Sequence, residues 1–226
     1  MLSVTKPAEP QKARSRHLAD TFEIWNRKIH YYLGLYFLFF LWLFAISGFL
    51  LNHPAWSFSK FIPDRRQTTF ERPIQAPPPG GDLAQARDIM RQIGLLGEIE
   101  WTTTRTDYGH FDFRVSRPGH VFDIKTDLVQ NRAAVQRIED NMWGIMFNLH
   151  TFTGVRMTDA RYQRDWTLTT VWALSMDAVA AGLVIMVLSG FYMWWGLRQK
   201  RLLGLIALAL GFLSCGFFAV GLRWIY

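Results

Sequence analysis

The chain has 226 residues, of which 50% are hydrophobic and only 19% charged, against about 25% charged in soluble domains. Its net charge is +7, but the basic residues are scattered along the chain, which argues against nucleic acid and favours anionic membrane lipid as a partner. The single cysteine, Cys215, leaves no intrachain disulfide and no cysteine-based metal site.

Three long apolar runs predict an integral membrane protein. Residues 1–29 are expected to form a cytoplasmic tail, with a surface helix at His17–Lys28. Residues 30–53 form the first transmembrane helix, because Tyr31–Leu51 is uncharged and long enough to cross a hydrocarbon core of ~30 Å. This run starts too far into the chain for a signal peptide. The second and third spans are predicted over 166–197 and 201–223.

The segment between the first two spans predicts a small folded module. Residues 54–80 are expected to be a linker, since they end in APPPGG, and residues 81–130 an α+β module. The module would contain a helix from Asp82 to Gly94. Strands are then predicted at Glu98–Arg105, His110–Ser116 and Val121–Lys125. Residues 131–165 are expected to be an interfacial helix, Ala133–Thr153, and a loop. The predicted fold class is thus an α-helical membrane protein with three transmembrane helices and a small α+β module.

The orientation follows from the basic residues beside the spans. The N-terminal tail and the turn between the second and third spans are rich in Lys and Arg, which favour the cytoplasmic side. The long segment 53–168 translocates regardless of its charge. We therefore expect the α+β module and the C-terminus to lie outside the cytoplasm.

Three histidines stand at predicted membrane boundaries. His30 and His53 are separated by ~35 Å along one helix and cannot serve one site. His53 and His150 share the outer boundary, and two imidazoles without a nearby cysteine or acidic cluster suit the axial positions of a b-type haem. The metal ligands would then be His53 and His150. The arginines available for the haem propionates are Arg156, Arg161 and Arg164.

Other interpretations of these residues stay open. Zinc normally takes a third protein ligand, copper is an alternative metal, and His53 is also compatible with a simple helix end. Asp177 lies inside the second span, where an acid is usually functional or paired. It is a candidate hydrogen-bond partner for the second nitrogen of His53 or His150, or for a serine such as Ser47 or Ser175.

Several motifs resemble a known family. NRKIHYYLGLYFLFFLWLFAISGFLLNH is similar to the first helix of PepSY-associated transmembrane proteins, NLHTFTG resembles their second Leu-His motif, and VLSGFYMWWGLRQKR resembles their Trp-containing helix. The module in between matches a PepSY domain in size and order. The chain departs from the family's larger reductases in having three spans and DIKTDL in place of the usual Asp-x-x-Thr-Gly turn.

This resemblance implies a bacterial inner-membrane protein with a periplasmic PepSY-like module. Some members of the family are haem-containing reductases of siderophore-bound iron, and His30, His53 and His150 match family histidines. The leading hypothesis is a membrane electron-transfer protein with haem b, serving a periplasmic redox partner or ferric chelate. A homodimer or a partner membrane subunit would complete an electron-transfer path across the membrane that includes His30. The alternatives are a non-redox membrane-anchored PepSY binding module and an accessory subunit of a respiratory complex.

Overall fold

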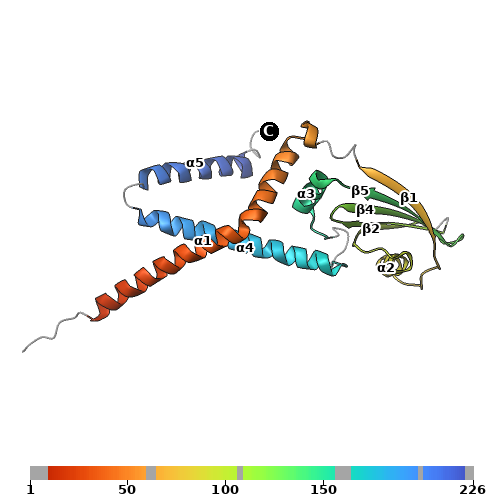
Figure 1. Cartoon of the computed structure of the whole chain (residues 1–226), viewed down its shortest axis with the longest axis horizontal. Coiled ribbons are helices and arrows are strands. Elements are labelled where there is room, and N and C mark those ends of the chain that lie inside the picture. Colours follow the sequence, from red (N-terminus) through yellow and green to blue (C-terminus); the bar gives the residue numbers. More distant parts are fainter. Residues whose placement is uncertain (1–9, 60–64, 106–108, 156–163, 198–200, 222–226) are drawn as a thin grey trace, which may run out of the picture. The chain divides into compact units, whose positions relative to one another are not determined.

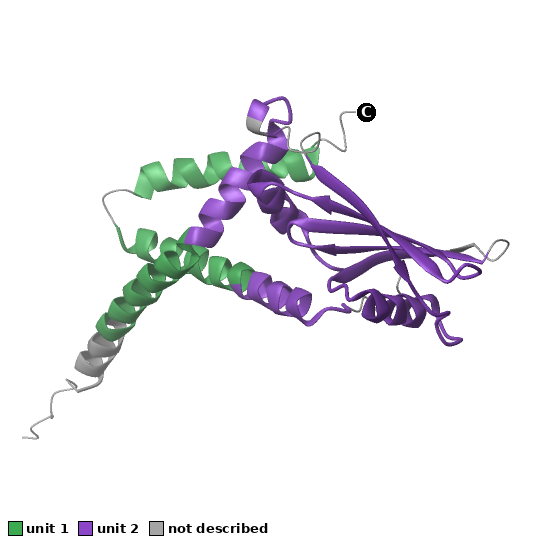
Figure 2. Cartoon of the chain, turned by 45° about the vertical axis from the view of Figure 1, so that its right-hand side comes forward, with its two compact units in different colours: residues 1–38, 179–226 green, residues 39–178 purple. Residues whose placement is uncertain are grey.

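The structure is a computed structural model that describes residues 10–59, 65–105, 109–155, 164–197 and 201–221. The chain forms two compact units, one of residues 1–38 and 179–226 and the other of residues 39–178 (Figure 2).

Within the described residues, three helices are long and apolar enough to cross a membrane (Figure 1). They are α1 (Pro10–Asn52), α4 (Thr167–Gly196) and α5 (Arg201–Ala219). The three predicted spans are thereby confirmed as helices. One detail differs, because the predicted surface helix His17–Lys28 and the first span form a single helix, α1. Neither glycine nor proline separates the two segments, so nothing in the sequence interrupts the helix there.

In the first unit, small residues let α1 and α4 pack closely. A Cβ atom at Gly182 would overlap the ring of Phe37. One turn or more away, the side chains of Asn26 and Ser189 each bond the other residue's backbone carbonyl, at 3.4 and 3.5 Å. Glycine at the contact and polar side chains across it are typical of helix pairs in membranes.

The second unit contains a five-stranded antiparallel sheet in the order β1-β5-β4-β3-β2. The strands are β1 (Arg66–Pro73), β2 (Glu98–Arg105), β3 (His110–Arg117), β4 (His120–Asp127) and β5 (Arg132–Glu139). Helix α2 (Asp82–Ile93) packs on one face through Ile89, which is fully buried against the alternate residues Phe111, Phe113 and Ile124. This alternation is what places every second side chain of a strand in the core.

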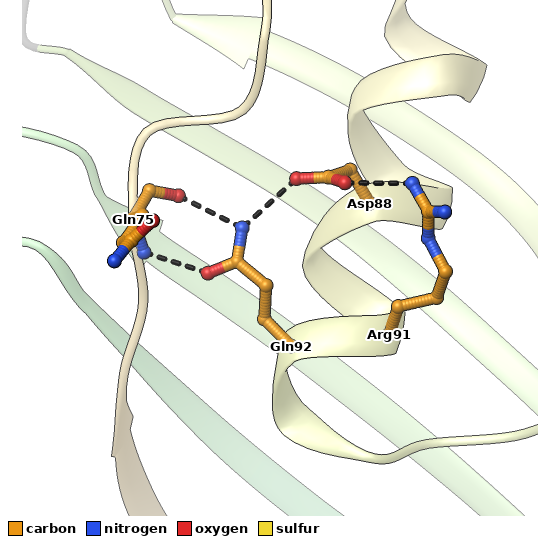
Figure 3. A network of polar contacts seen from close by, with 4 residues as sticks. All are labelled: Gln75, Asp88, Arg91 and Gln92. Atoms are coloured by element: carbon orange, nitrogen blue, oxygen red, sulfur yellow. Dashed lines mark hydrogen bonds and ion pairs between the residues drawn. The ribbon is translucent and has the colours of Figure 1, made fainter.

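A polar network ties α2 to the segment that follows β1 (Figure 3). The Gln92 side-chain amide accepts the N–H of Gln75 at 2.6 Å and donates to the Gln75 carbonyl at 3.1 Å. It also donates to Asp88, which in turn pairs with Arg91. The glutamine thus satisfies a backbone donor and acceptor just beyond the strand, where sheet partners are absent.

The sequence prediction is wrong at both ends of the module. Residues 133–139 belong to strand β5, not to a helix, and the predicted linker 54–80 contains strand β1 and the short 3-10 helix Ser57–Ser59. The sheet therefore extends beyond the predicted module 81–130. Ala133 and Val135 are buried in alternation, as a strand requires. The helix after β5 is only α3 (Met142–Thr151), which begins at Asn141, whose side chain accepts the N–H of Gly144 at 3.0 Å.

Candidate functional site

His150 lies on the half-buried face of α3, against the C-terminal part of α1. Its Nδ1 atom is 2.7 Å from the Oγ atom of Ser47, which is itself fully buried. The ring of Phe44 stands edge-on to the imidazole, with 5.2 Å between centroids. These contacts fix the imidazole at the junction of α1 and α3.

The hydroxyl of Ser47 has a second contact, with the carbonyl of Leu43 at 2.7 Å in the same helix. With its single proton donated to that carbonyl, Oγ accepts a hydrogen bond from the tautomer of His150 that is protonated at Nδ1. In this tautomer Nε2 has a free lone pair, which is the state in which a histidine binds a metal.

His53 has different neighbours. It follows the last residue of α1, its N–H donates to the carbonyl of Phe49 at 3.0 Å, and its exposed ring stacks on Trp56 with 4.1 Å between centroids. Along the helix, His53 lies ~9 Å beyond Ser47 and about a third of a turn around the axis. Ser47 therefore holds His150 on a different face of α1 from the one that carries His53.

His30 belongs to the first unit. It is half-buried beside Gly190, where an added Cβ would lie 3.6 Å from its ring. Within the described part of the chain, its Nδ1 atom is buried and has no hydrogen-bond partner. A polar nitrogen in this state is costly in an apolar setting, so His30 is a second candidate for a ligand contact.

The remaining predicted site residues are dispersed. The Nε atom of Arg164 donates to the carbonyl of Thr153 at 3.0 Å, which anchors the arginine near the end of α3. Asp177 is exposed on α4, and no hydrogen bond joins it to a described histidine. Arg156 and Arg161 lie outside the described residues. The serine beside His150, and not the aspartate, is thus the polar partner of the imidazole.

A cavity of about 440 Å³ lies beside α3. It is enclosed by the start of β2, the β3–β4 turn, the end of α3 and the segment after it. Among its lining residues are Trp101, Ser116, Asn148 and Phe152. Two of these, Asn148 and Phe152, flank His150 in the sequence. Sequence reasoning missed the cavity, because its walls come from three separate chain segments, of which only the one at the end of α3 contains a motif, NLHTFTG.

Glu98 fixes this region to the second span. Its carboxylate is almost completely buried and accepts the N–H groups of Asp165 and Trp166 at 2.7 and 3.0 Å. These are the residues just before α4, where free N–H groups and the helix dipole both favour a negative charge. Glu98 was also missed, since a glutamate at the start of a strand gives no signal of this role.

The described residues contain no group of three or more His, Cys, Asp and Glu side chains that could hold a metal ion. A bare metal such as zinc would need such a group. An iron carried by a porphyrin needs only axial ligands from the protein, and a single imidazole on each side is enough.

Comparison with curated proteins found no significant match, and comparison with solved structures found none either. Residues 6–196 match the family described as "PepSY-associated TM region". This match covers all of the first two spans and the whole α+β module. Together with its three apolar helices and its antiparallel module, it shows that the chain belongs to the PepSY-associated transmembrane family.

Proposed function

We propose that the protein is a b-type haem protein of the bacterial inner membrane that passes electrons to or from a periplasmic acceptor such as a ferric chelate. The observation that carries this proposal is the contact between Nδ1 of His150 and Oγ of Ser47, 2.7 Å apart, which in the Nδ1-protonated tautomer leaves Nε2 for a metal. A haem bound there would supply a one-electron Fe(III)/Fe(II) couple.

The residues around His150 fit such a group. The imidazole is half-buried and flanked by the ring of Phe44, so a bound porphyrin would find an apolar wall. His53 is the proposed second ligand of the haem. Because it leaves a different face of α1 from the one that holds His150, its exposed ring would have to turn toward His150 to serve the same group. Releasing it from the stack on Trp56 costs about 1 kcal/mol, which is small beside the strength of an iron–imidazole bond.

Charged residues of the same unit would hold the edge of the group. Arg164 donates its Nε–H to Thr153, and no hydrogen bond or ion pair to another described residue is made by its terminal nitrogens, which suit a propionate. Arg156 and Arg161 are the other proposed propionate partners, and Asp177 a further polar contact. His30, on the part of α1 that belongs to the first unit, is proposed to serve a second site completed by a second copy or a partner membrane subunit.

The proposed orientation places the N-terminus in the cytoplasm and the α+β module and C-terminus in the periplasm. It rests on the basic residues of the N-terminal tail and of the turn before α5. Membrane lipid is then the partner common to all three spans.

The test is the absorption spectrum of the full chain purified from haem-replete cells. We expect a Soret band and sharp reduced α and β bands, which His150→Ala and His53→Ala should each abolish. His110→Ala is the matched control, because His110 lies on β3 and bonds the Thr126 carbonyl. His30→Ala should also leave this spectrum intact. A colourless wild-type protein without extractable haem would refute the proposal.

The cavity beside α3 favours a second candidate, a non-redox binding module anchored by the spans. A pocket of this size with aromatic walls and a few polar groups is typical of ligand sites. This candidate predicts a colourless protein whose stability responds to substitutions at Trp101 and Phe152 only when a ligand is present. An accessory-subunit role would instead require a copurifying membrane partner.

A further inference from the structure

One corner of the sheet gathers basic side chains around a single aromatic ring. The guanidinium carbon of Arg117 lies 5.5 Å from the ring centroid of Phe122, and the imidazole of His120 stacks on the same ring at 6.1 Å. Arg137, on the neighbouring strand, places Nη2 2.9 Å from Nε2 of His120. We call Arg117, His120, Phe122 and Arg137 the arginine–histidine corner.

The corner carries surplus positive charge. Arg137 pairs with Glu139 at 2.7 Å. Nearby, Arg65 pairs with the fully buried carboxylate of Asp140 at 2.6 Å. Arg117, by contrast, has no ion pair with any described residue, and its charge contacts only the face of Phe122. Arg137 also retains a buried Nε atom without a hydrogen-bond partner in the described chain. Two basic groups are thus left with unused donors.

The corner lies at the end of the sheet where the membrane helices arrive. The β3–β4 turn contacts α3, since a Cβ at Gly119 would lie 3.3 Å from Ile145, and α3 contacts α1 through His150. At the same end, Glu98 bonds the residues that begin α4. One end of each of two candidate spans therefore belongs to this end of the module, and in a membrane crossed by these spans the corner would lie near the headgroups.

The opposite end of the same strands has a different character. There Arg132 begins β5 and its charge is matched by Glu71, 3.8 Å away. His110 bonds a backbone carbonyl, and the residue paired with it on β2 is Arg105. The contrast between the two ends supplies matched control residues on the same strands.

We propose that the arginine–histidine corner binds the phosphate of an anionic phospholipid headgroup. Arg117 and Arg137 supply fixed positive charge and donors, which suit phosphate oxygens. Each basic residue near an anionic surface contributes about 1 kcal/mol. The site is independent of the haem proposal, because it needs only the module and the adjacent ends of the spans.

His120 makes this binding depend on pH. Burial lowers the pKa of His120, and the positive charges of Arg117 and Arg137 lower it further, against the opposite effect of Glu139 and Asp140. The neutral ring accepts from Arg137 through Nε2. A phosphate would offset the arginine charges, so the bound lipid favours the protonated, positively charged ring. Binding should therefore strengthen as the pH falls.

The experiment measures the dissociation constant of short-chain phosphatidylglycerol on the full chain in a neutral detergent. Phosphatidylcholine of the same chain length and inorganic phosphate are titrated in parallel. We expect phosphatidylglycerol to bind at least tenfold more tightly than either. Arg117→Gln and Arg137→Gln should each weaken binding about fivefold, the equivalent of ~1 kcal/mol, whereas Arg132→Gln should leave it unchanged. Should Arg117→Gln fold poorly, Arg117→Lys must retain most of the binding.

The pH arm uses His120→Gln with His110→Gln as its control. The wild type and His110→Gln should bind phosphatidylglycerol more tightly at pH 5.5 than at pH 8, and His120→Gln should lose this difference. Equal binding of the two lipids, or equal weakening by Arg132→Gln and Arg117→Gln, would overturn the proposal. Inorganic phosphate binding as tightly as the lipid would also overturn it, in favour of a free-anion site.

Discussion

The hydroxyl of Ser47 and Nδ1 of His150, 103 positions apart in the sequence, lie 2.7 Å from each other and join α1 to α3. A serine inside an apolar helix normally donates its hydroxyl proton to a carbonyl of its own helix, and Ser47 has this contact with the carbonyl of Leu43. A serine that donates in this way accepts from its neighbour. In that arrangement Nδ1 of His150 carries the proton and Nε2 is the nitrogen that a metal would bind.

The first prediction concerns this contact. Ser47→Ala removes the acceptor of the Nδ1 proton, so we expect the affinity of the protein for haem to fall by about tenfold. The measurement is a Soret titration of haem into the purified apoprotein. Ser175→Ala is the control, because Ser175 makes the same type of bond to its own helix, to Val171, without a histidine partner. Equal losses in both variants would argue against the role of Ser47.

The second prediction concerns Glu98. Glu98→Gln replaces one carboxylate oxygen by an amide that cannot accept, so one buried N–H of Asp165 or Trp166 loses its partner. The expected cost is about 1–3 kcal/mol. It should appear as a lower midpoint of thermal unfolding in detergent. Glu100→Gln, two residues along the same strand and exposed, should leave the midpoint unchanged. A stable Glu98→Gln protein would mean that the start of α4 is held by other contacts.

Much of the fold could be predicted from the sequence because its signals are local. An uncharged run the length of a bilayer admits one structure, a helix. The end of helix α2 is also signalled locally. Its C-cap residue, Gly94, has a φ of 72°, a left-handed conformation that glycine adopts more easily than other residues. Strands β2, β3 and β4 are separated by turn residues, so their positions were predicted to within two residues.

The prediction failed for strands β1 and β5, and the reason is physical. Strand β1 lies at the edge of the sheet, and only Phe70 and the residue after the strand, Ile74, turn inward, so no alternation of apolar residues marks it. In β5 the apolar residues continue into α3 with spacing that also fits a helix. Residues 132–139 form a strand because they pair with β4. That pairing is a tertiary contact, so the local sequence does not reveal it.

The site was predictable only in part for the same reason. A histidine at the end of an apolar run signals a boundary position, and the sequence predicted both His53 and His150 as boundary residues. The partner of His150 depends on how α3 turns back onto α1, which no local pattern encodes. The cavity beside α3 likewise depends on three segments meeting in space.

The third prediction follows from the lowered pKa of His120. A histidine whose pKa is lower in the folded state than its unfolded value of about 6.5 binds protons more readily when unfolded. Its contribution to stability is therefore present above pH 6.5 and is lost as the pH falls through the folded pKa. We expect the thermal midpoint to decrease from pH 8 to pH 5.5, by less in His120→Gln than in the wild type. His110→Gln should retain the full decrease.

The fourth prediction concerns topology. With the N-terminus in the cytoplasm, three crossings place the C-terminus outside. Alkaline phosphatase fused after Tyr226 should be active, and a fluorescent protein that folds only in the cytoplasm should be dark there. The same two reporters fused after Leu197 should give the reverse result, which controls for expression. Fluorescence at Tyr226 would show that the number of crossings or the orientation is wrong.

The fifth prediction tests the packing of α1 on α4. A side chain at Gly182 would occupy the space of the Phe37 ring, which is itself almost completely buried. Gly182→Leu should therefore push the helices apart and lower the yield of monodisperse protein in detergent, because overpacking of a tight contact costs about 1–3 kcal/mol. Gly211→Leu adds the same side chain on α5, where nothing lies within 4 Å of the new Cβ, and should be tolerated. Phe37→Ala, by making room for the leucine, should recover part of the loss in the double variant. Recovery would show that the defect arises from this contact and not from a leucine in α4 as such.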